Sequence, residues 1–404
     1  MKQEVLNQIN RQKEKLIQLS DYIHDHPQWD GHETLAAKVL TDYLKEQGFE
    51  VEIGIAGLPT AFRAVYEKGN GGPSIGFLCE YDALEGLGHG CGHHMQGPSC
   101  LGAAVALKRI LENDKNGDKE SDRKDDFVQN VRLVVYGTPA EETFGGKINM
   151  LNAGYFKDID VALMMHGAPD TCTDIKCLAL SSFDVTYLGK SAHAALAPEK
   201  GRSAFDSLLL AFQGVEFLRE HVRDDVRMNY TMLELPGPEN VVPDRAVGRF
   251  TLRSYSRDYL NEVIERFNDI IKGAALMGGT EYEIKELPAL DNKIPVFSLN
   301  DLLMENAKQV GAPQIVPPRE KTGSTDFGNV MHQLPGACIR VQFVPVGTSS
   351  HTKAYVEAGK TDAAHNCVMY GAKILAGTAW DLITSPALLK KVKEEFIENR
   401  KIYG

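Results

Sequence analysis

The spacing of apolar side chains along residues 1–142 changes repeatedly between a helical and an extended period. Apolar side chains three and four positions apart predict amphipathic helices at residues 1–27, 32–48 and 101–113. Short apolar runs bounded by Gly and Pro predict strands at residues 49–55, 62–68, 74–82 and 131–142. Strands that alternate with helices in this way are typical of an α/β layered sheet.

The order of predicted elements changes after residue 177. A strand, a helix, two strands, a helix and a strand follow one another at residues 178–190, 201–222, 226–235, 245–256, 259–278 and 280–288. This β-α-β-β-α-β order is the split βαβ pattern of a ferredoxin-like unit. The earlier alternation then resumes, with predicted elements at residues 299–310, 336–345 and 362–383.

Because the same alternation flanks this segment on both sides, the simplest organisation is a small domain inserted into a larger one. We expect a discontinuous α/β domain with a mixed sheet, made of residues 1–177 and 293–404, and an inserted ferredoxin-like domain at residues 178–292. A chain of 404 residues is also longer than one hydrophobic core usually supports. Clefts between such domains commonly bind ligands.

Charge and composition narrow the class of partner. The net charge is -11 and no Lys/Arg-rich block interrupts it, so we expect no nucleic acid and no membrane partner, but a small molecule or a peptide. The N-terminus lacks the apolar core of a secretory signal, and no apolar run reaches the ~18 residues of a membrane span. The seven cysteines follow no disulfide spacing, which indicates reduced thiols in a cytoplasmic protein. The charged stretch at residues 112–126 is expected to be a solvated surface loop.

Candidate metal ligands stand in the stretch HGCGHH at residues 89–94. Cys91 and His93 follow a predicted strand and precede a predicted helix, and loops at this carboxyl edge of an α/β sheet commonly form sites. Thiolate and imidazole are good ligands for zinc-like ions. The C-x-H spacing matches no zinc-finger pattern, so a buried incidental thiol and a thiol-redox role of Cys91 remain alternatives.

Further candidate ligands stand where other predicted strands end. Glu141 and Glu142 close one apolar run, His166 closes another, and His351 lies in a polar loop. Each of these residues alone could have a purely structural role. The two glutamates, for example, could belong to the first turn of a helix, where the helix dipole favours negative charge. Together with Cys91 and His93, these residues supply more ligands than one catalytic zinc needs and favour a pair of ions. Two ions ~3.5 to 4 Å apart can bridge a water, lower its pKa and polarise a carbonyl, and the glutamate that is not a ligand would be the general base.

These residues resemble the M-20 metallopeptidase family, and most closely its amidohydrolase subfamily, over nearly the whole chain. "EYDAL" and "HGCGHH" are similar to the motifs D-x-D-A-L and H-A-C-G-H-D, "EE" to the paired glutamates, and "MMHGAP" to the ligand-bearing H-x-x-P. The resemblance implies a catalytic domain of zinc-exopeptidase type with two divalent ions, Zn²⁺ or Mn²⁺. The implied metal ligands are Cys91, His93, Glu142, His166 and His351. Glu141 is implied as the general base, and Asp82 as the residue that orients the site from behind.

The inserted segment resembles the lid and dimerisation domain of the same family. "GKSAHAALAPEKGRSA" is similar to its G-x-x-x-H-A motif, which implies that His193 reaches into a neighbouring subunit and stabilises the oxyanion of the tetrahedral intermediate. "ENVVPDRAVGRFTLR" is similar to the segment whose Asn and Arg hold the carboxylate of the substrate, which implies Asn240 and Arg253. "KTGSTDFGNV" resembles a loop near the substrate, and its candidates are Ser324, Thr325 and Asp326.

Two residues depart from the subfamily pattern. His94 stands where an Asp is common, and Glu80 replaces another common Asp. From the sequence we expect a cytoplasmic, metal-dependent amidohydrolase that cleaves dipeptides or N-acyl amino acids, as aminoacylases and dipeptidases do, and that forms a homodimer or higher homo-oligomer through the lid. The alternative is a non-catalytic protein of the same fold that binds peptides or amino acids.

Overall fold

The computed structural model describes residues 1–113 and 128–404. The charged stretch for which we expect a surface loop lies outside the described residues from residue 114 onward. The chain divides into two compact units. The large unit comprises residues 1–176 and 293–402, and the small unit comprises residues 177–292 and 403–404.

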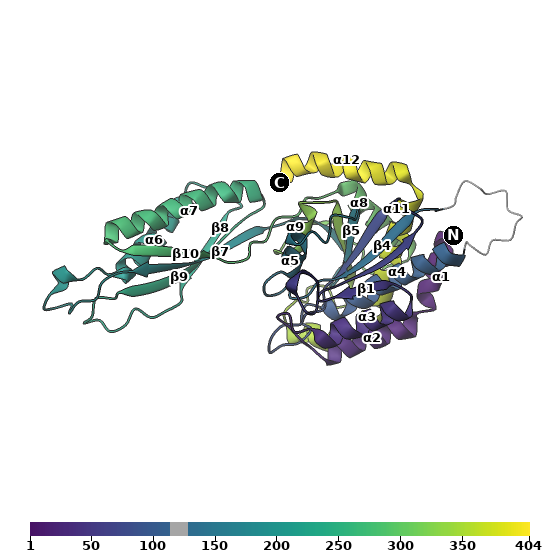
Figure 1. The fold of residues 1–404 in the computed structure, drawn as a ribbon, viewed down its shortest axis with the longest axis horizontal. Coiled ribbons are helices and arrows are strands. Elements are labelled where there is room, and N and C mark those ends of the chain that lie inside the picture. The colour runs from purple at the N-terminus through teal and green to yellow at the C-terminus, as the bar shows by residue number, and fades with distance from the viewer. Residues whose placement is uncertain (114–127) are drawn as a thin grey trace, which may run out of the picture. The chain divides into compact units, whose positions relative to one another are not determined.

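An eight-stranded mixed sheet forms the centre of the large unit (Figure 1). In spatial order, its strands are β1 (Glu50–Ile53), β2 (Phe62–Lys68), β4 (Val131–Gly137), β3 (Ser74–Cys79), β5 (Val161–Ala168), β12 (Gly336–Gln342), β6 (Cys172–Cys177) and β11 (Arg319–Thr322). Strands β4, β3, β5 and β12 are parallel to one another, whereas β2 and β6 pair antiparallel with this central group. The predicted α/β class with a mixed sheet is therefore confirmed.

Helices cover both faces of this sheet, which is why its central strands are almost continuously apolar. On one face, α4 (Gln96–Asn113) packs against α11 (Asp362–Thr384), and they contact α1 (Lys2–Asn10), α2 (Lys13–Asp25) and α8 (Phe297–Gln309). On the other face, α5 (Gly146–Asn152) packs against α9 (Phe327–Met331). Successive strand residues point to opposite faces, so Met164 joins the core around α9, whereas Met165 reaches Gly371 of α11. The large unit also contains α3 (Thr34–Glu46), α10 (Lys353–Ala358), α12 (Pro386–Tyr403) and the 3-10 turns η1 (Ile55–Gly57) and η2 (His93–Met95).

The first predicted helix is interrupted in the structure. Helix α1 ends at Asn10 and α2 begins at Lys13, although the apolar spacing continues across the break. Between them, the buried side chain of Gln12 donates to the backbone oxygen of Gln8 at 3.0 Å and accepts from the Tyr43 hydroxyl at 2.8 Å. A satisfied polar side chain thus anchors the turn inside the core.

The small unit is a four-stranded antiparallel sheet with two helices. Its elements are β7 (Ala179–Leu188), η4 (Pro198–Lys200), α6 (Ala204–Arg219), β8 (Arg227–Met232), β9 (Arg245–Ser254), α7 (Arg257–Gly278) and β10 (Glu281–Glu286). Apart from the short turn η4, this is the order that the sequence predicts, and the spatial order of the strands is β10-β7-β9-β8. Ser203 and Ser256 cap the N-termini of α6 and α7. Phe183, Phe250 and Phe267 belong to a core of its own, as expected for a domain.

Membrane-spanning helices and disulfide bonds are both absent from the described residues. Within residues 1–113 and 128–404, no helix is both long enough and apolar enough to cross a membrane. All seven cysteines are free thiols, and six of them are buried.

Candidate active site

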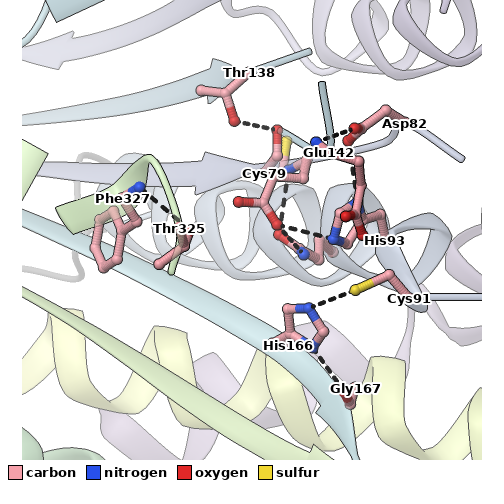
Figure 2. Close-up of polar contacts among 12 residues, drawn as sticks. Cys79, Asp82, Cys91, His93, Thr138, Glu142, His166, Gly167, Thr325 and Phe327 are labelled. Atoms are coloured by element: carbon pink, nitrogen blue, oxygen red, sulfur yellow. Dashed lines mark hydrogen bonds and ion pairs between the residues drawn. The ribbon is translucent and has the colours of Figure 1, made fainter. Parts of the chain in front are cut away.

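The stretch HGCGHH forms a tight loop between the carboxyl end of β3 and the start of α4. Gly92 adopts a φ of +85°, which side chains rarely tolerate, and a Cβ there would also lie 3.0 Å from Met95 Cε. The loop brings Cys91 Sγ to 3.5 Å from Nε2 of His166 in β5 (Figure 2). The ring centroids of His93 and His166 are 5.4 Å apart. The sulfur and both imidazoles therefore face one another.

Asp82 supports two of the candidate ligands from behind. One oxygen of its buried carboxylate accepts a hydrogen bond from His93 Nδ1 at 3.0 Å, and the other accepts from the backbone N–H of Glu142 at 2.9 Å (Figure 2). A carboxylate behind an imidazole fixes the orientation of the ring and leaves Nε2 available to a metal. The geometry suits the orienting role expected for Asp82.

The paired glutamates lie in a turn after β4, and helix α5 begins only after them. Glu142 Oε1 is buried, makes no hydrogen bond among the described residues and lies 3.2 Å from His351 Nε2. Burial raises the pKa of Glu141 well above its usual value, and the carboxylates of Glu80 and Asp326 add to this shift. One glutamate therefore offers an acceptor atom to a cation, and the other takes up a proton more readily than an ordinary carboxylate.

The two remaining predicted ligands come from segments later in the chain. His166 Nδ1 lies 2.7 Å from the backbone oxygen of Gly167, and a proton on Nδ1 leaves the Nε2 lone pair directed toward Cys91. The backbone N–H of His351 donates to the oxygen of Gly90 at 2.8 Å. This bond ties the His351 loop to the loop that carries Cys91.

The structure brings all five predicted ligands together. Their potential ligand atoms lie within 4.8 Å of one another in overlapping groups, which are Cys91 with His93 and His166, Cys91 with Glu142 and His351, and His93 with Glu141 and Glu142. A thiol, imidazoles and a carboxylate side by side form a donor set that suits ions such as Zn²⁺. Burial raises the pKa of Cys91 to about 12, so its thiol is unlike the low-pKa thiols of redox sites, and a bound cation would stabilise its thiolate.

A buried network of charges lies behind these residues. Lys147 Nζ donates to Glu80 at 2.5 Å and to Asp326 at 2.7 Å, and all three side chains are buried. The second oxygen of Glu80 accepts from Gln96 at 2.7 Å and lies 3.3 Å from His93 Nε2. Burial disfavours the charge on Lys147, but the two carboxylates hold its pKa above the usual value. No local pattern in the sequence predicts Lys147 or Gln96 as part of the site.

A cavity of about 660 Å³ within the large unit opens onto the candidate ligands. Cys91, Glu141, Glu142, His166 and His351 line one part of it. Ser324 and Thr325 also line the cavity, and Ser324 Oγ is buried without a hydrogen bond among the described residues. Asp326 is fully buried and accepts a hydrogen bond from Lys147, and its expected contact with substrate stays a prediction.

The predicted residues of the small unit lie at two ends of its sheet. His193 follows β7, and the backbone N–H of Ala194 donates to the oxygen of Asn240 at 3.0 Å. His193 Nδ1 accepts from the N–H groups of Ala195 and Leu196 at 3.3 Å, so its proton resides on Nε2, which is the tautomer of a hydrogen-bond donor. His193 and Asn240 therefore occupy neighbouring loops.

Arg253 lies at the opposite end of strand β9. It pairs with Leu180 at the start of β7, whereas the end of β7 next to His193 pairs with Arg245. The strand between Arg245 and Arg253 spans roughly 27 Å at ~3.4 Å per residue. One chain therefore cannot place Asn240 and Arg253 on the same carboxylate.

The family model described as Peptidase family M20/M25/M40 matches residues 78–380. This chain belongs to that family. The match covers the loop that carries Cys91 and His93, the paired glutamates and the loop that carries His351. It confirms the resemblance that the motifs indicate. The chain is an enzyme of a peptidase family, and its class of reaction is the hydrolysis of peptide or amide bonds.

Relatives of this M20 enzyme span nearly its whole length. It is 33% identical to the Xaa-Arg dipeptidase of Mus musculus, over 98% of this chain and 92% of the relative. It is 28% identical to a subunit of the p-aminobenzoyl-glutamate hydrolase of Escherichia coli (strain K12), over 96% of this chain and 93% of the relative.

Solved structures share the fold of this M20 enzyme. A putative aminohydrolase from methicillin-resistant Staphylococcus aureus superimposes with a TM-score of 0.76 at 20% identity, over 95% of this chain and 100% of that one. The YxeP protein of Bacillus subtilis, described as a dinuclear metal-binding peptidase from the M20 family, superimposes with a TM-score of 0.69 at 19% identity, over 93% and 99% of the two chains. At these identities, the likeness shows the fold alone.

In this M20 enzyme, three histidine rings lie close together beneath the loop that carries Cys91 and His93, and they belong to His24, His89 and His94. The ring centroid of His94 lies 4.9 Å from that of His24 and 5.2 Å from that of His89. His94 Nε2 bonds to the backbone oxygen of Gly359 at 2.9 Å, and His89 Nε2 bonds to that of Ile23 at 3.0 Å. The Nδ1 atoms of all three histidines are buried without a hydrogen bond among the described residues. His94 therefore points away from the candidate ligands and fastens their loop to the segment after α10.

Proposed function

We propose that this M20 enzyme is a metal-dependent amide hydrolase that acts on dipeptides or N-acyl amino acids. The observation that carries the proposal is the convergence of five ligand-type side chains and Glu141 at one part of a cavity. Relatives named Xaa-Arg dipeptidase, p-aminobenzoyl-glutamate hydrolase and indole-3-acetyl-aspartic acid hydrolase support an amide substrate that contains an amino acid. The free cysteines and the acidic charge support a cytoplasmic enzyme.

Two divalent ions, Zn²⁺ or Mn²⁺, would be held by Cys91, His93, Glu142, His166 and His351. The ligand groups overlap, because Cys91, His93 and Glu142 each belong to two of them, and this overlap suits two neighbouring ions better than one. When bound, such ions would lower the pKa of a water and polarise the carbonyl of the substrate. The buried oxygen of Glu142 that makes no hydrogen bond among the described residues supports a cation at this position.

Glu141 would transfer the proton in this reaction. It lines the cavity, and its raised pKa, caused by burial and by Glu80 and Asp326, suits a carboxylate that takes a proton from water and gives it to the leaving amine. Lys147 limits this shift, because its positive charge offsets the two supporting carboxylates. Glu142 follows Glu141 in the chain, and the Asp82 carboxylate accepts a hydrogen bond from the backbone N–H of Glu142.

The small unit would be a ferredoxin-like lid and dimerisation domain. His193 would donate from Nε2 to the oxyanion of the tetrahedral intermediate. Because His193 and Asn240 lie at one end of the sheet and Arg253 at the other, residues of both ends would meet one substrate only if they came from two different chains. This separation supports an active site that is shared between subunits.

Exposed apolar side chains support the same role. Of the eighteen large apolar side chains that are exposed in the described chain, ten belong to the small unit, which is the smaller part of the molecule. Leu196, Phe217, Leu235, Leu276 and Met277 are each at least 74% exposed. An excess of exposed apolar surface is typical of a protein–protein contact, and a second copy of the chain is the partner that we propose.

Metal analysis combined with a hydrolysis screen tests the proposed activity. Wild type and Glu141→Gln are loaded with Mn²⁺ or Zn²⁺, their metal content is measured, and both are assayed on dipeptides and N-acyl amino acids. We expect about two ions per chain in both proteins, and a kcat that is about 10²- to 10⁴-fold lower in the variant, because the proton carrier is lost while the ligands stay. The same metal content is the control that the site is intact.

A non-catalytic binding protein would give a different result. Wild type would hydrolyse none of the substrates, and wild type and Glu141→Gln would bind the same peptide equally well. That outcome would replace the hydrolase proposal by the binding alternative.

A further inference from the structure

The chain enters and leaves the small unit through two segments that are hydrogen-bonded to each other. Residues 177–181 lead into the unit, and residues 287–292 lead out of it. The backbone N–H of Leu180 donates to the oxygen of Leu290 at 2.7 Å, and the N–H of Leu290 donates to the oxygen of Leu180 at 2.9 Å. These bonds lie at the end of the small sheet where β7 begins, and we call this end the base of the sheet.

The guanidinium of Arg257 binds both segments at once. Arg257 is the first residue of α7, and its side chain is 12% exposed. On the entering segment, it donates to Ser181 Oγ at 2.9 Å and to the oxygen of Leu180 at 3.0 Å. On the leaving segment, it donates to the oxygen of Leu290 at 2.5 Å and to the Asp291 carboxylate at 2.7 Å. We call Arg257 and these four acceptors the base clasp, and all three nitrogens of the planar guanidinium take part in it.

The backbone of the same arginine is linked to a third segment. The N–H of Arg257 donates to Asn292 Oδ1 at 2.8 Å, and Asn292 Nδ2 donates to the oxygen of Tyr403 at 2.6 Å. Tyr403 and Gly404 belong to the small unit, whereas Ile402 belongs to the large unit. All three places at which the chain passes from one unit to the other are therefore tied to Arg257, either directly or through Asn292.

The base clasp is separate from the hydrophobic core of the small unit. Helix α7 contributes Val263, Phe267 and Ile271 to that core, further along the helix than Arg257. Replacement of a hydrogen-bonding side chain outside the core should therefore loosen the base, while the sheet and the two helices keep their packing.

A change of direction at the base has its largest effect at the other end of the sheet. Strand β7 has ten residues, runs from the base to Leu188, and is followed by His193. Ten strand residues span ~34 Å, so a rotation of ~10° about the base displaces the far end by ~6 Å. Arg253, in contrast, pairs with Leu180 of the base clasp and would hardly move.

We infer that Arg257 is a positioning residue, which sets the direction of the small sheet at its base and thereby the place of His193 at the far end. The inference rests on the proposed function, in which His193 stabilises the oxyanion, and it adds a residue that acts only through His193. A shift of ~1 Å at a catalytic group can cost about 100-fold in rate, so kcat is the quantity that depends on Arg257.

Steady-state kinetics of Arg257→Gln, loaded with Mn²⁺ and assayed on the substrate that wild type hydrolyses fastest, test the inference. We expect kcat to fall at least about tenfold, because His193 is displaced from the oxyanion. KM should change less than about threefold, because Arg253 and the large unit stay in place. Arg257→Lys keeps a charge for Asp291 but cannot reach all four acceptors, so it should recover only part of kcat.

Two further variants accompany this measurement. Asp291→Asn leaves Arg257 in place but removes the charge of one acceptor, so it should also lower kcat, and it carries the comparison if Arg257→Gln unfolds. Arg249→Gln is the matched control, because Arg249 lies in β9 of the same sheet and donates to Asp184 in the middle of β7 at 2.6 and 2.9 Å. Its kcat should equal that of wild type.

A double-mutant cycle separates positioning from a general loss of structure. His193→Ala removes the group that Arg257 positions, so the addition of Arg257→Gln to His193→Ala should lower kcat by less than about twofold. A general structural defect would instead lower kcat by the same factor in both backgrounds.

Hydrogen exchange measures the base clasp without any substrate. In Arg257→Gln, the amides of Leu180 and Leu290 should exchange at least about tenfold faster than in wild type, because the bonds between their segments open more often. Amides in the middle of β7 should keep their exchange rates, and Arg249→Gln should leave both sets unchanged.

The results distinguish this inference from the proposed function. An active hydrolase whose kcat is unchanged in both Arg257→Gln and Asp291→Asn overturns the inference and leaves the function intact. An equal loss of kcat with and without His193 also overturns it. If wild type hydrolyses none of the substrates, the proposed function fails. The exchange rates of Leu180 and Leu290 then decide whether Arg257 fastens the base, with unchanged rates as the contrary result.

Discussion

His94 illustrates how a single residue supports the candidate site without entering it. Its imidazole is fully buried, bonds to Gly359 and contacts the rings of His24 and His89. Burial lowers the pKa of His94 to about 3, and His24 adds to the shift, so the ring is neutral in the folded protein. In place of the carboxylate common in the subfamily, the loop is fastened by a neutral donor.

A pH dependence of stability follows for His94. Its folded pKa of about 3 lies below the unfolded value of ~6.5, so the unfolded chain takes up the proton first, and the stability from this residue is lost as the pH falls below ~6.5. In metal-free protein, the free energy of unfolding of His94→Asn should fall less steeply between pH 6.5 and 4 than that of wild type, by up to about 1.4 kcal/mol per pH unit. Both tryptophans, Trp29 and Trp380, lie in the large unit. Urea unfolding followed by tryptophan fluorescence therefore measures the free energy of unfolding of this unit.

The matched control for His94 is His221→Asn, which makes the same exchange at an exposed position of the small unit. Its pH profile should coincide with that of wild type. Parallel profiles for His94→Asn and wild type would contradict a buried neutral imidazole.

At the scale of elements, buried charge pairs fasten strands and helices that are distant in sequence. Asp174 in β6 binds Arg340 in β12 and Lys293, and Lys147 in α5 binds Asp326 at the start of α9. Burial opposes the ionisation of Asp174, but Arg340 and Lys293 hold its pKa below the usual range. The Asp174 carboxylate thereby holds two side chains that line the cavity, Arg340 and Lys293.

Loss of the Asp174 carboxylate should destabilise the large unit. In Asp174→Asn, Arg340 and Lys293 keep buried charges without their partner, which costs about 3 kcal/mol or more. The folded pKa of Asp174 is lowered, so its contribution is present above ~4 and disappears as the pH falls. Guanidinium unfolding should therefore show a large difference from wild type at pH 7 that shrinks toward pH 3. A difference that is the same at both pH values would refute the role of the charge.

Local patterns in the sequence predict the elements and the five ligands, but not these pairs. The convergence of the five candidate ligands could be expected because most of them stand where an apolar run ends, and such ends meet at one edge of a parallel sheet. Lys147 and Asp326 are 179 positions apart, and Arg340 and Asp174 are 166 apart, so only the folded sheet shows that they meet. The motif locates the loop that carries Asp326, but it does not show the buried Lys147 that donates to the Asp326 carboxylate. The strand that separates Arg253 from Asn240 is predicted from the sequence, but the motif alone treats the two residues as one binding pair.

At the scale of the whole molecule, the proposed sharing of the active site determines which variants can complement one another. Glu141 belongs to the large unit and His193 to the small unit. If each site uses His193 of the partner subunit, a dimer of one Glu141→Gln chain and one His193→Ala chain has one complete site.

Coexpression of the two inactive variants tests this arrangement. Each variant alone should lose kcat while it retains its metal. Random pairing yields mixed dimers as half of the population, each with one complete site of two, so the mixture should recover about a quarter of wild-type kcat. No recovery in verified mixed dimers would show that His193 acts within its own chain, and an unchanged kcat in His193→Ala alone would remove His193 from the mechanism.

The pair of Asp174 and Lys293 has one more consequence. Asp174 stands just before the chain leaves the large unit and Lys293 is the first residue after it returns, and their side chains meet at 2.9 Å. The exit and the entry of the chain are thus joined by a buried ion pair at strand β6. We therefore expect that the small unit can be deleted, and that a short Gly-Ser bridge from residue 176 to residue 293 leaves a large unit that folds as a single domain.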